Sequence, residues 1–325
     1  MQSKANNSQE PDKKPSVTDA ASLKPVTDEE VKQPVDGEPA ATTLGDVLEA
    51  VEELWPKSLA EDWDAVGLVT GRSAQQITKV VMAVDPTLVV IEDAIARGAD
   101  LLITHHPLLL RGVTQVAGTS FKGEAIHRLI ETGTALLTAH TNADNAIGGV
   151  NDALSDAFGL KDCVPLVHSK DGLPEEGLGR VGFLDKPMKL EDFAERVYTV
   201  LPAVAGGVRV AGDRTGIIRK VALCGGAGDS LFDAVRSHQA DVYVTADLRH
   251  HPASEAREAA NGGFPYLIDV SHFASEWVWL SAGARALQNV LNDLGHSVEI
   301  EISQINSDPW DFVLLGSSPE KPTLT

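Results

Sequence analysis

Short apolar runs alternate along this chain with segments of helical spacing. Residues 44–54 have the pattern of an amphipathic helix, with Thr43 as N-cap and Pro56 as a stop. The apolar runs predict buried strands over 79–84, 100–104, 135–138, 221–224, 241–245 and 266–270. Further helices are predicted over 87–97, 122–131 and 190–200 and from Ser230 onward.

Strands that alternate with helices are typical of parallel β-α units. The segment 160–215 interrupts the series because it is rich in Gly and Pro. We therefore predict two α/β lobes with mixed, largely parallel sheets flanked by helices. Residues 43–125 together with 240–315 are assigned to a first, discontinuous lobe, and residues 126–239 to a second.

Both ends of the chain are predicted to lie outside the lobes. Residues 1–42 are mildly acidic, rich in Pro and small polar residues, and poor in large apolar groups. Such a segment cannot bury enough apolar surface to offset its ordering entropy, so we expect a disordered acidic tail. Residues 316–325 are expected to form a flexible tail.

The composition narrows the class of protein. The 325 residues are 43% hydrophobic and 23% charged, as in globular proteins. A run of about 18 apolar residues and a signal-peptide core are both missing from the sequence, and Cys163 and Cys224 form no disulfide framework. These features favour a cytoplasmic protein without a membrane span. The net charge of −20 argues against direct nucleic-acid binding, because it repels phosphate groups. A requirement for solubility would by itself explain the negative charge.

Histidines and carboxylates follow the ends of several predicted strands. Ligands of parallel sheets lie beyond the carboxyl ends of the strands, where these side chains would gather. Imidazole and carboxylate together suit zinc, iron, manganese or nickel, and a pair of divalent ions is typical of hydrolytic chemistry. The predicted metal ligands are His105, His106, Asp144, His272 and Glu276, and the predicted site lies between the lobes.

Each of these residues also has a purely structural explanation. His105 and His106 would serve as hydrogen-bonded loop residues, and Asp144 as a turn residue. Glu276 would complement a helix dipole in a first turn. If a helix starts near Phe273, His272 and Glu276 share one face and can hold one ion.

Other residues are candidates for supporting roles. His140, His250 and His251 would orient ligands or transfer protons, and they would equally serve as polar loop residues. The Gly-rich segment 225–229 precedes a predicted helix and would either bind an anion or allow tight packing of the strand against the helix.

The motifs taken together resemble the GTP cyclohydrolase 1 type 2 family, also called the Nif-three-like family. The resemblance covers residues 43–315. It is carried by WDAVGLVTG from Trp63, THHPLL from Thr104, HTNADNAIGGVND from His140, CGGAGD from Cys224, VTADLRHH from Val244 and DVSHFASE from Asp269.

The resemblance implies a dinuclear metal site in a ring-shaped homohexamer. It implies His105, His106, Asp144, His272 and Glu276 as metal ligands, with Asp144 and Glu276 shared between ions. It implies GTP as a small-molecule substrate, with attack on C8 of the purine and formate release towards dihydroneopterin triphosphate. His250 or His251 would then transfer protons.

Two alternatives remain open from the sequence. One is a two-metal phosphoesterase that acts on a small phosphorylated molecule, and the other is a non-catalytic metal-binding regulatory or interaction protein. The chain also departs from the family pattern at Ala65, at Ala246-Asp247 and at Gly225-Gly226, which concerns substrate contacts more than metal binding. The extra middle domain of longer members is expected to be absent.

Overall fold

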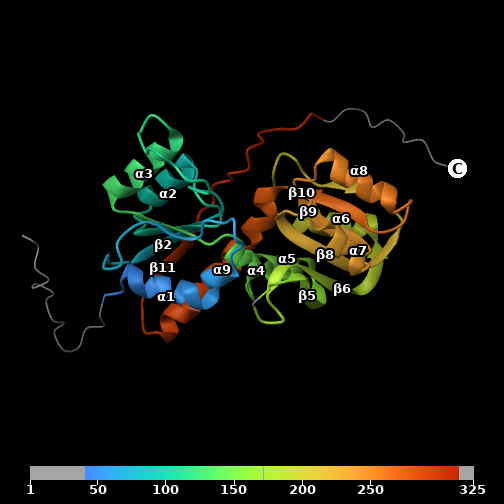
Figure 1. Cartoon of the computed structure of the whole chain (residues 1–325), viewed down its shortest axis with the longest axis horizontal. Coiled ribbons are helices and arrows are strands. Elements are labelled where there is room, and N and C mark those ends of the chain that lie inside the picture. Colours follow the sequence, from blue (N-terminus) through green and yellow to red (C-terminus); the bar gives the residue numbers. More distant parts are fainter. Residues whose placement is uncertain (1–40, 171, 315–325) are drawn as a thin grey trace, which may run out of the picture. The chain divides into compact units, whose positions relative to one another are not determined.

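The computed structural model describes residues 41–170 and 172–314 (Figure 1). Within these residues, the strands form two sheets. The tail predicted over 1–42 lies outside the described residues except for positions 41 and 42, and the tail predicted over 316–325 lies outside them entirely. Thr42 is buried and its carbonyl accepts a hydrogen bond from the amide of Ile77, so the ordered body includes it.

The first sheet has the strand order β1-β4-β3-β2-β11. Its central strands pair in parallel and only β1 is antiparallel to its neighbour. The apolar runs of β2, β3 and β4 are buried because helices cover both faces. The strands span Gly67–Thr70 (β1), Lys79–Ala83 (β2), Leu101–Thr104 (β3), Ala135–Thr138 (β4) and Glu299–Ile302 (β11).

The helices of this sheet begin at good caps. Thr43 forms a capping box with Asp46 at the start of α1, and Thr87 and Ser120 cap α2 and α3 through their hydroxyls. Helices α2 and α3 pack together on one face, and α1 lies over the other (Figure 1). These elements span Leu44–Leu54 (α1), Leu88–Ala96 (α2) and Phe121–Thr132 (α3), with a short 3-10 helix at Lys57–Leu59.

The second sheet is more mixed. Its order is β5-β6-β8-β9-β10-β7, in which β8, β9 and β10 pair in parallel and the outer strands are antiparallel. The strands span Leu160–His168 (β5), Gly177–Lys189 (β6), Arg209–Ala211 (β7), Ile217–Ala227 (β8), Val242–Ala246 (β9) and Tyr266–Val270 (β10).

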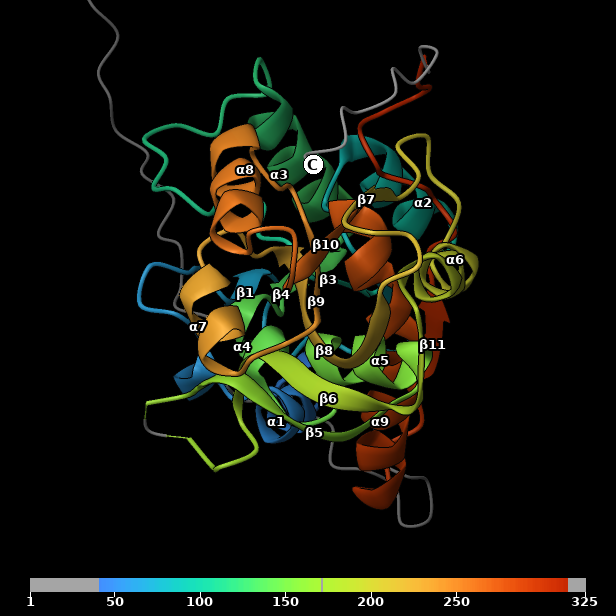
Figure 2. The same cartoon turned by 90° about the vertical axis from the view of Figure 1, so that its right-hand side faces the viewer.

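Helices also cover both faces of the second sheet. Helices α7 and α8 lie on one side of β8, β9 and β10, and α6 lies on the other (Figure 2). The remaining helices span Thr141–Asn145 (α4), Val150–Phe158 (α5), Leu190–Val200 (α6), Phe232–Ser237 (α7) and His250–Ala259 (α8).

The long helix α9, His272–Asp293, contacts both sheets. It is capped by Ser271, whose hydroxyl accepts from the amide of Ala274. Trp279 is fully buried, with its ring 5.0 Å from Trp55 and 5.7 Å from His105. The helix therefore fills the core of the first sheet while its first turn reaches the carboxyl ends of the strands.

The predicted fold class, two α/β lobes with mixed sheets flanked by helices, is confirmed. The strands divide between the sheets at other points than 125/126 and 239/240. Strand β4 belongs to the first sheet, and β9 and β10 belong to the second. The reason is that β4 pairs with β3 in register, whereas β9 and β10 extend the parallel series that β8 begins. Among the described residues, no helix has the length and apolar character that crossing a membrane requires.

Candidate metal centre

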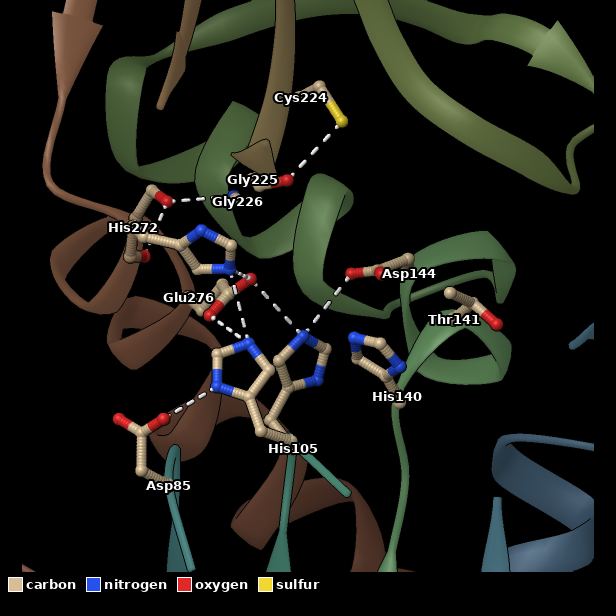
Figure 3. Close-up of polar contacts among 12 residues, drawn as sticks. Asp85, His105, His140, Thr141, Asp144, Cys224, Gly225, Gly226, His272 and Glu276 are labelled. Atoms are coloured by element: carbon tan, nitrogen blue, oxygen red, sulfur yellow. Dashed lines mark hydrogen bonds and ion pairs between the residues drawn. The ribbon is translucent and has the colours of Figure 1, made fainter. Parts of the chain in front are cut away.

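The candidate site is built at the carboxyl ends of parallel strands from both sheets. His105 and His106 follow β3, and His140 follows β4 two residues after its end. His272 follows β10 and begins α9, which also carries Glu276 one turn later. The side chains of His105, His140, Asp144, His272 and Glu276 converge on one space (Figure 3).

Three atoms of the cluster are buried without a hydrogen-bond partner among the described residues, and they are Nε2 of His105, Oδ1 of Asp144 and Oε2 of Glu276. The first two of these atoms lie 3.7 Å apart. His105 is fully buried, and Asp144 nearly so. A buried polar atom without a partner costs about 1–3 kcal/mol. Such a pair is stabilised when a cation binds both atoms.

Glu276 lies at the centre of three imidazoles. Its carboxylate oxygens lie 3.0 Å from Nε2 of His106, 3.0 Å from Nε2 of His272 and 3.4 Å from Nε2 of His105. The carboxylate is 3% exposed, so it is removed from bulk water. One buried carboxylate is thus placed to bind ions on both sides.

Each imidazole is oriented through its other nitrogen. Nδ1 of His105 lies 2.9 Å from the carbonyl oxygen of Ala139, which can only accept, so this Nδ1 carries the proton. Nδ1 of His106 lies 2.7 Å from Asp85, and Nδ1 of His272 lies 2.7 Å from Asp247. In the neutral rings, all three Nε2 atoms therefore present lone pairs, as in metal-binding histidines.

His140 has the same arrangement. Its Nδ1 lies 2.8 Å from Oδ1 of Asp64, and Thr141 donates to the other oxygen of that carboxylate. Nitrogens of His105, His106 and His140 lie within 4.8 Å of one another, as do ligand atoms of His106, His272 and Glu276. His140 thus belongs to the same cluster as the predicted ligands.

The charges of the cluster reinforce one another. Burial lowers the pKa of His106 and of His272, but Glu276 and the outer carboxylates outweigh it and raise these values to about 10 and about 11. Burial raises the pKa of Glu276, yet the three imidazoles hold it well below its usual value. Burial is also the main reason why the pKa of Asp144 is raised. An ionised Glu276 in this buried cluster is therefore stabilised by positive charge on or between the surrounding imidazoles.

The surrounding backbone leaves room for an ion. A Cβ atom on Gly226 would lie 2.4 Å from Oε1 of Glu276 and 3.1 Å from Nε2 of His272, at a φ of +65°. The amide of Gly226 donates to Ser275, and the amide of Gly225 donates to Asn151. Side chains of the protein already bind these two amides, so they are not available to an anion, and Gly226 instead allows the strand end to lie close to Glu276 and His272. The unpaired atoms and this glycine cradle fit a metal ion.

The cluster opens into a cavity of about 790 Å³. His106, His140, Asp144, His272 and Glu276 lie on its wall. The volume falls in the range of small-molecule sites. Trp63 also lines the cavity, and its ring packs edge-on against the His140 ring with 5.9 Å between the ring centroids.

The structure brings all five sequence-predicted metal residues together. It does not bring His250 and His251 to them. Both are exposed at the start of α8, and His250 lines a separate hollow of about 550 Å³. The helix begins four residues beyond the end of β9, and neither side chain lines the cavity of the cluster. Their role in proton transfer stays a prediction.

Three carboxylates of the site were missed by the sequence analysis. Asp64, Asp85 and Asp247 orient His140, His106 and His272. Asp85 and Asp247 come just after buried strands, which is the same signal that identified the histidines. Asp247 lies at one of the positions where the chain departs from the family pattern, and its Oδ2 lies 2.7 Å from Nδ1 of His272, with a φ of +55°.

Comparison with known proteins shows the family to which the chain belongs. Residues 42–309 match the family described as Duf34/NIF3 (NGG1p interacting factor 3). This chain belongs to the Duf34/NIF3 family. The resemblance seen in the sequence motifs is thereby confirmed.

Relatives in the Duf34/NIF3 family cover nearly the whole ordered body. A Streptomyces coelicolor protein named GTP cyclohydrolase 1 type 2 homolog is 47% identical over 268 residues, which is 82% of this chain and 93% of that protein. A Mycobacterium bovis protein of the same name is 34% identical over 374 aligned positions, with 83% and 97% covered. That alignment is longer than the 325 residues of this chain, so the Mycobacterium bovis protein contains additional residues.

A solved structure of a Bacillus cereus protein related to NIF3 has the same fold. Its TM-score is 0.76 at 25% identity, and the match covers 85% of this chain and all of that one. The Duf34/NIF3 fold thus places the histidine cluster of this chain at the carboxyl ends of both parallel strand series.

Proposed function

We propose that this chain is a divalent-metal-dependent hydrolase that acts on GTP and releases formate. The names of its relatives suggest the substrate, and the histidine cluster supplies the chemistry. The observation that carries the proposal is the pair of buried, unpaired atoms, Nε2 of His105 and Oδ1 of Asp144, next to a cavity of about 790 Å³ that Asp144 lines.

In this proposal His105, Asp144 and Glu276 would hold one ion, and His106, His272 and Glu276 would hold a second. Divalent ions polarise substrate oxygens and bring the pKa of water towards neutrality. The orientation of each imidazole is fixed without an ion, because its Nδ1 is hydrogen-bonded to a carbonyl or carboxylate oxygen of the protein.

The cavity has two chemically different ends. Trp63 is 60% exposed and offers an aromatic face to a purine ring. Glu61 and Asp62 lie beside it, and carboxylates accept hydrogen bonds from the N–H groups of guanine. Lys170 is the only Lys or Arg among the described residues that line this cavity. We assign Trp63 to the base and Lys170 to the phosphates.

Proton transfer is assigned to His140. It lies in the same cavity as the cluster, and its Nδ1 is held by Asp64 at 2.8 Å. Burial raises the pKa of Asp64, but hydrogen bonds from His140 and Thr141 outweigh this and hold the pKa below its usual value. An ionised Asp64 holds the His140 ring through Nδ1 and leaves Nε2 free to exchange a proton, as a positioned acid-base catalyst requires.

A ring-shaped homohexamer in the cytoplasm completes the proposal. The C-terminal end of the described chain supports assembly, because Trp310 is 71% exposed and Phe312 is 75% exposed. Large apolar side chains of this kind gain stability when another copy covers them. Light scattering coupled to gel filtration gives the mass of the assembly.

Metal content and product analysis test the proposal together. We expect two divalent ions per chain in purified protein, and equal amounts of formate and consumed GTP. Phosphate release without formate would instead indicate a phosphoesterase. Metal binding without turnover of GTP or other nucleotides would indicate a binding protein, and a failure to bind metal after reconstitution would refute the proposal.

A further inference from the structure

The chain segment after β11 contacts the residues that hold His106 and His272 in the candidate metal centre. We call residues 303–310 the strap, which follows β11 in Figure 1. Ser307 of the strap donates its hydroxyl to Oδ2 of Asp85 at 2.5 Å. The other oxygen of Asp85, Oδ1, accepts from Nδ1 of His106 at 2.7 Å. A single carboxylate thus joins the strap to a candidate metal ligand.

A second hydrogen bond joins the strap to the other side of the cluster. The hydroxyl of Ser271 donates to Oδ2 of Asp308. The same hydroxyl caps α9 by accepting from the amide of Ala274 at 3.2 Å. Because His272 is the first residue of α9, Asp308 holds the helix start that carries this imidazole.

The strap itself is anchored at several points. The amide of Asp308 donates to Asn306, and the amide of Trp310 donates to Asp308. Ser303 donates to Asp93 at 2.9 Å, near the start of the strap. The two amide bonds fix the direction of the Asp308 carboxylate, whereas the Ser303 bond holds only the first residue of the strap.

The strap also forms part of a second cavity of about 790 Å³ behind the cluster. His106 and His272 line both this cavity and the one that holds Asp144 and Glu276. Ser307, Asp308 and Trp310 line only the rear one. The two imidazoles therefore form a partition, and the strap supports it from the side that faces away from Glu276.

We propose that Ser307 and Asp308 are positioning residues that raise the affinity of the centre for divalent metal. This inference rests on the proposed metal function. Without the strap, Asp85 and Ser271 would bind water, and the two imidazoles would sample more orientations. Loss of a direct partner of a metal-binding histidine typically weakens metal binding by about 10–100-fold. Ser307 acts one hydrogen bond further out, so we expect a loss of about 3–10-fold.

Chelator competition with Zn²⁺ tests the proposal on the full chain. Ser307→Ala should raise the Kd for Zn²⁺ by about 3–10-fold, and Ser307→Thr, which keeps the hydroxyl, should restore it. Ser303→Ala is the matched control, because it removes a serine–carboxylate bond from the same strap at a carboxylate that contacts no histidine. The control should leave the Kd unchanged.

Equal Kd values for Ser307→Ala, Ser303→Ala and the parent protein would overturn the proposal, as would a parent protein that binds no Zn²⁺. If Ser307→Ala does not fold, Asp308→Ala carries the same test, because it removes the acceptor of the Ser271 hydroxyl. The result is separable from the proposed activity, since the Kd is measured without nucleotide. If Ser307→Ala raises the Kd for Zn²⁺ as expected but the parent protein does not turn over GTP, only the proposed activity is refuted. If the parent protein turns over GTP but Ser307→Ala leaves the Kd unchanged, only the inference is refuted.

Discussion

The Nε2 atoms of His106 and His272 lie 3.2 Å apart, although each ring is already bound through Nδ1 to a carboxylate. A carboxylate accepts, so the proton of each neutral ring is on Nδ1 and two lone pairs would face each other. Lone pairs at this distance repel. A proton or a metal ion must therefore be bound to one or both of these Nε2 atoms. Protons and metal ions compete for the same lone pairs.

This competition predicts how the metal-free protein responds to pH. The pKa values of His106 and His272, about 10 and about 11, lie above the ordinary value of 6.5. Groups whose pKa rises on folding stabilise the protein fully below the unfolded value and lose this effect as pH rises through the folded values. The thermal midpoint of chelator-treated protein should therefore fall between about pH 6.5 and pH 11. Metal-loaded protein should fall less, because ions replace the protons. Parallel curves for both samples would contradict this.

Gly226 should be intolerant of a side chain. In Gly226→Ala, the new methyl would lie 2.4 Å from Oε1 of Glu276, so we expect metal content to fall to less than half. The control is Gly98→Ala, with a φ of +73° and nothing within 4 Å of the added Cβ. Both variants carry about 1–2 kcal/mol of backbone strain. Metal analysis and thermal unfolding separate the effects, and equal metal loss in both variants would refute the cradle.

Lys170 should affect substrate binding rather than the chemical step. Lys170→Ala should raise KM for GTP by about tenfold, near 1.4 kcal/mol, with little change in kcat. Guanosine binding should be unaffected, since it carries no phosphate. Lys161→Ala is the control, an exposed lysine of β5 that does not line the cavity. A KM that is unchanged in Lys170→Ala would place the phosphates elsewhere.

His140 and the His250-His251 pair can be separated by their effect on turnover. We expect His140→Gln to lower kcat by about 10²–10⁴-fold, the usual contribution of a positioned acid-base group. His250→Gln and His251→Gln should retain activity, because both side chains are exposed and neither lines the cavity of the cluster. The measurement is formate release at saturating GTP. A loss of kcat in His250→Gln or His251→Gln alone would restore the role that the sequence suggested.

The strands that carry the cluster were predictable because they are buried on both faces. Runs such as Leu101–Thr104 and Tyr266–Val270 contain almost only apolar residues, and their polar successors stand out. The histidines were therefore found from pattern alone. The partner carboxylates were not, because an Asp in a loop or directly after a strand is most often explained as a turn residue.

The second sheet was harder to predict in full. Strands β5 and β6 contain Pro165 and Pro187, and many of their side chains are exposed. These features are those of a loop, and pairing within the sheet overrides them. The lobe boundaries differed for a related reason, since no local pattern shows that β9 and β10 continue the sheet of β8.

The separation of the ligands along the chain determines when the centre can exist during synthesis. His106 and His272 are 166 positions apart, and α9 is among the last elements to leave the ribosome. A nascent chain that has completed only the first parallel strands holds His105, His106 and Asp144 without Glu276. Such a chain cannot yet share a carboxylate between two ions. In the proposed two-ion centre, metal loading would therefore follow completion of the fold, and an ion captured earlier would be held by an incomplete set of ligands.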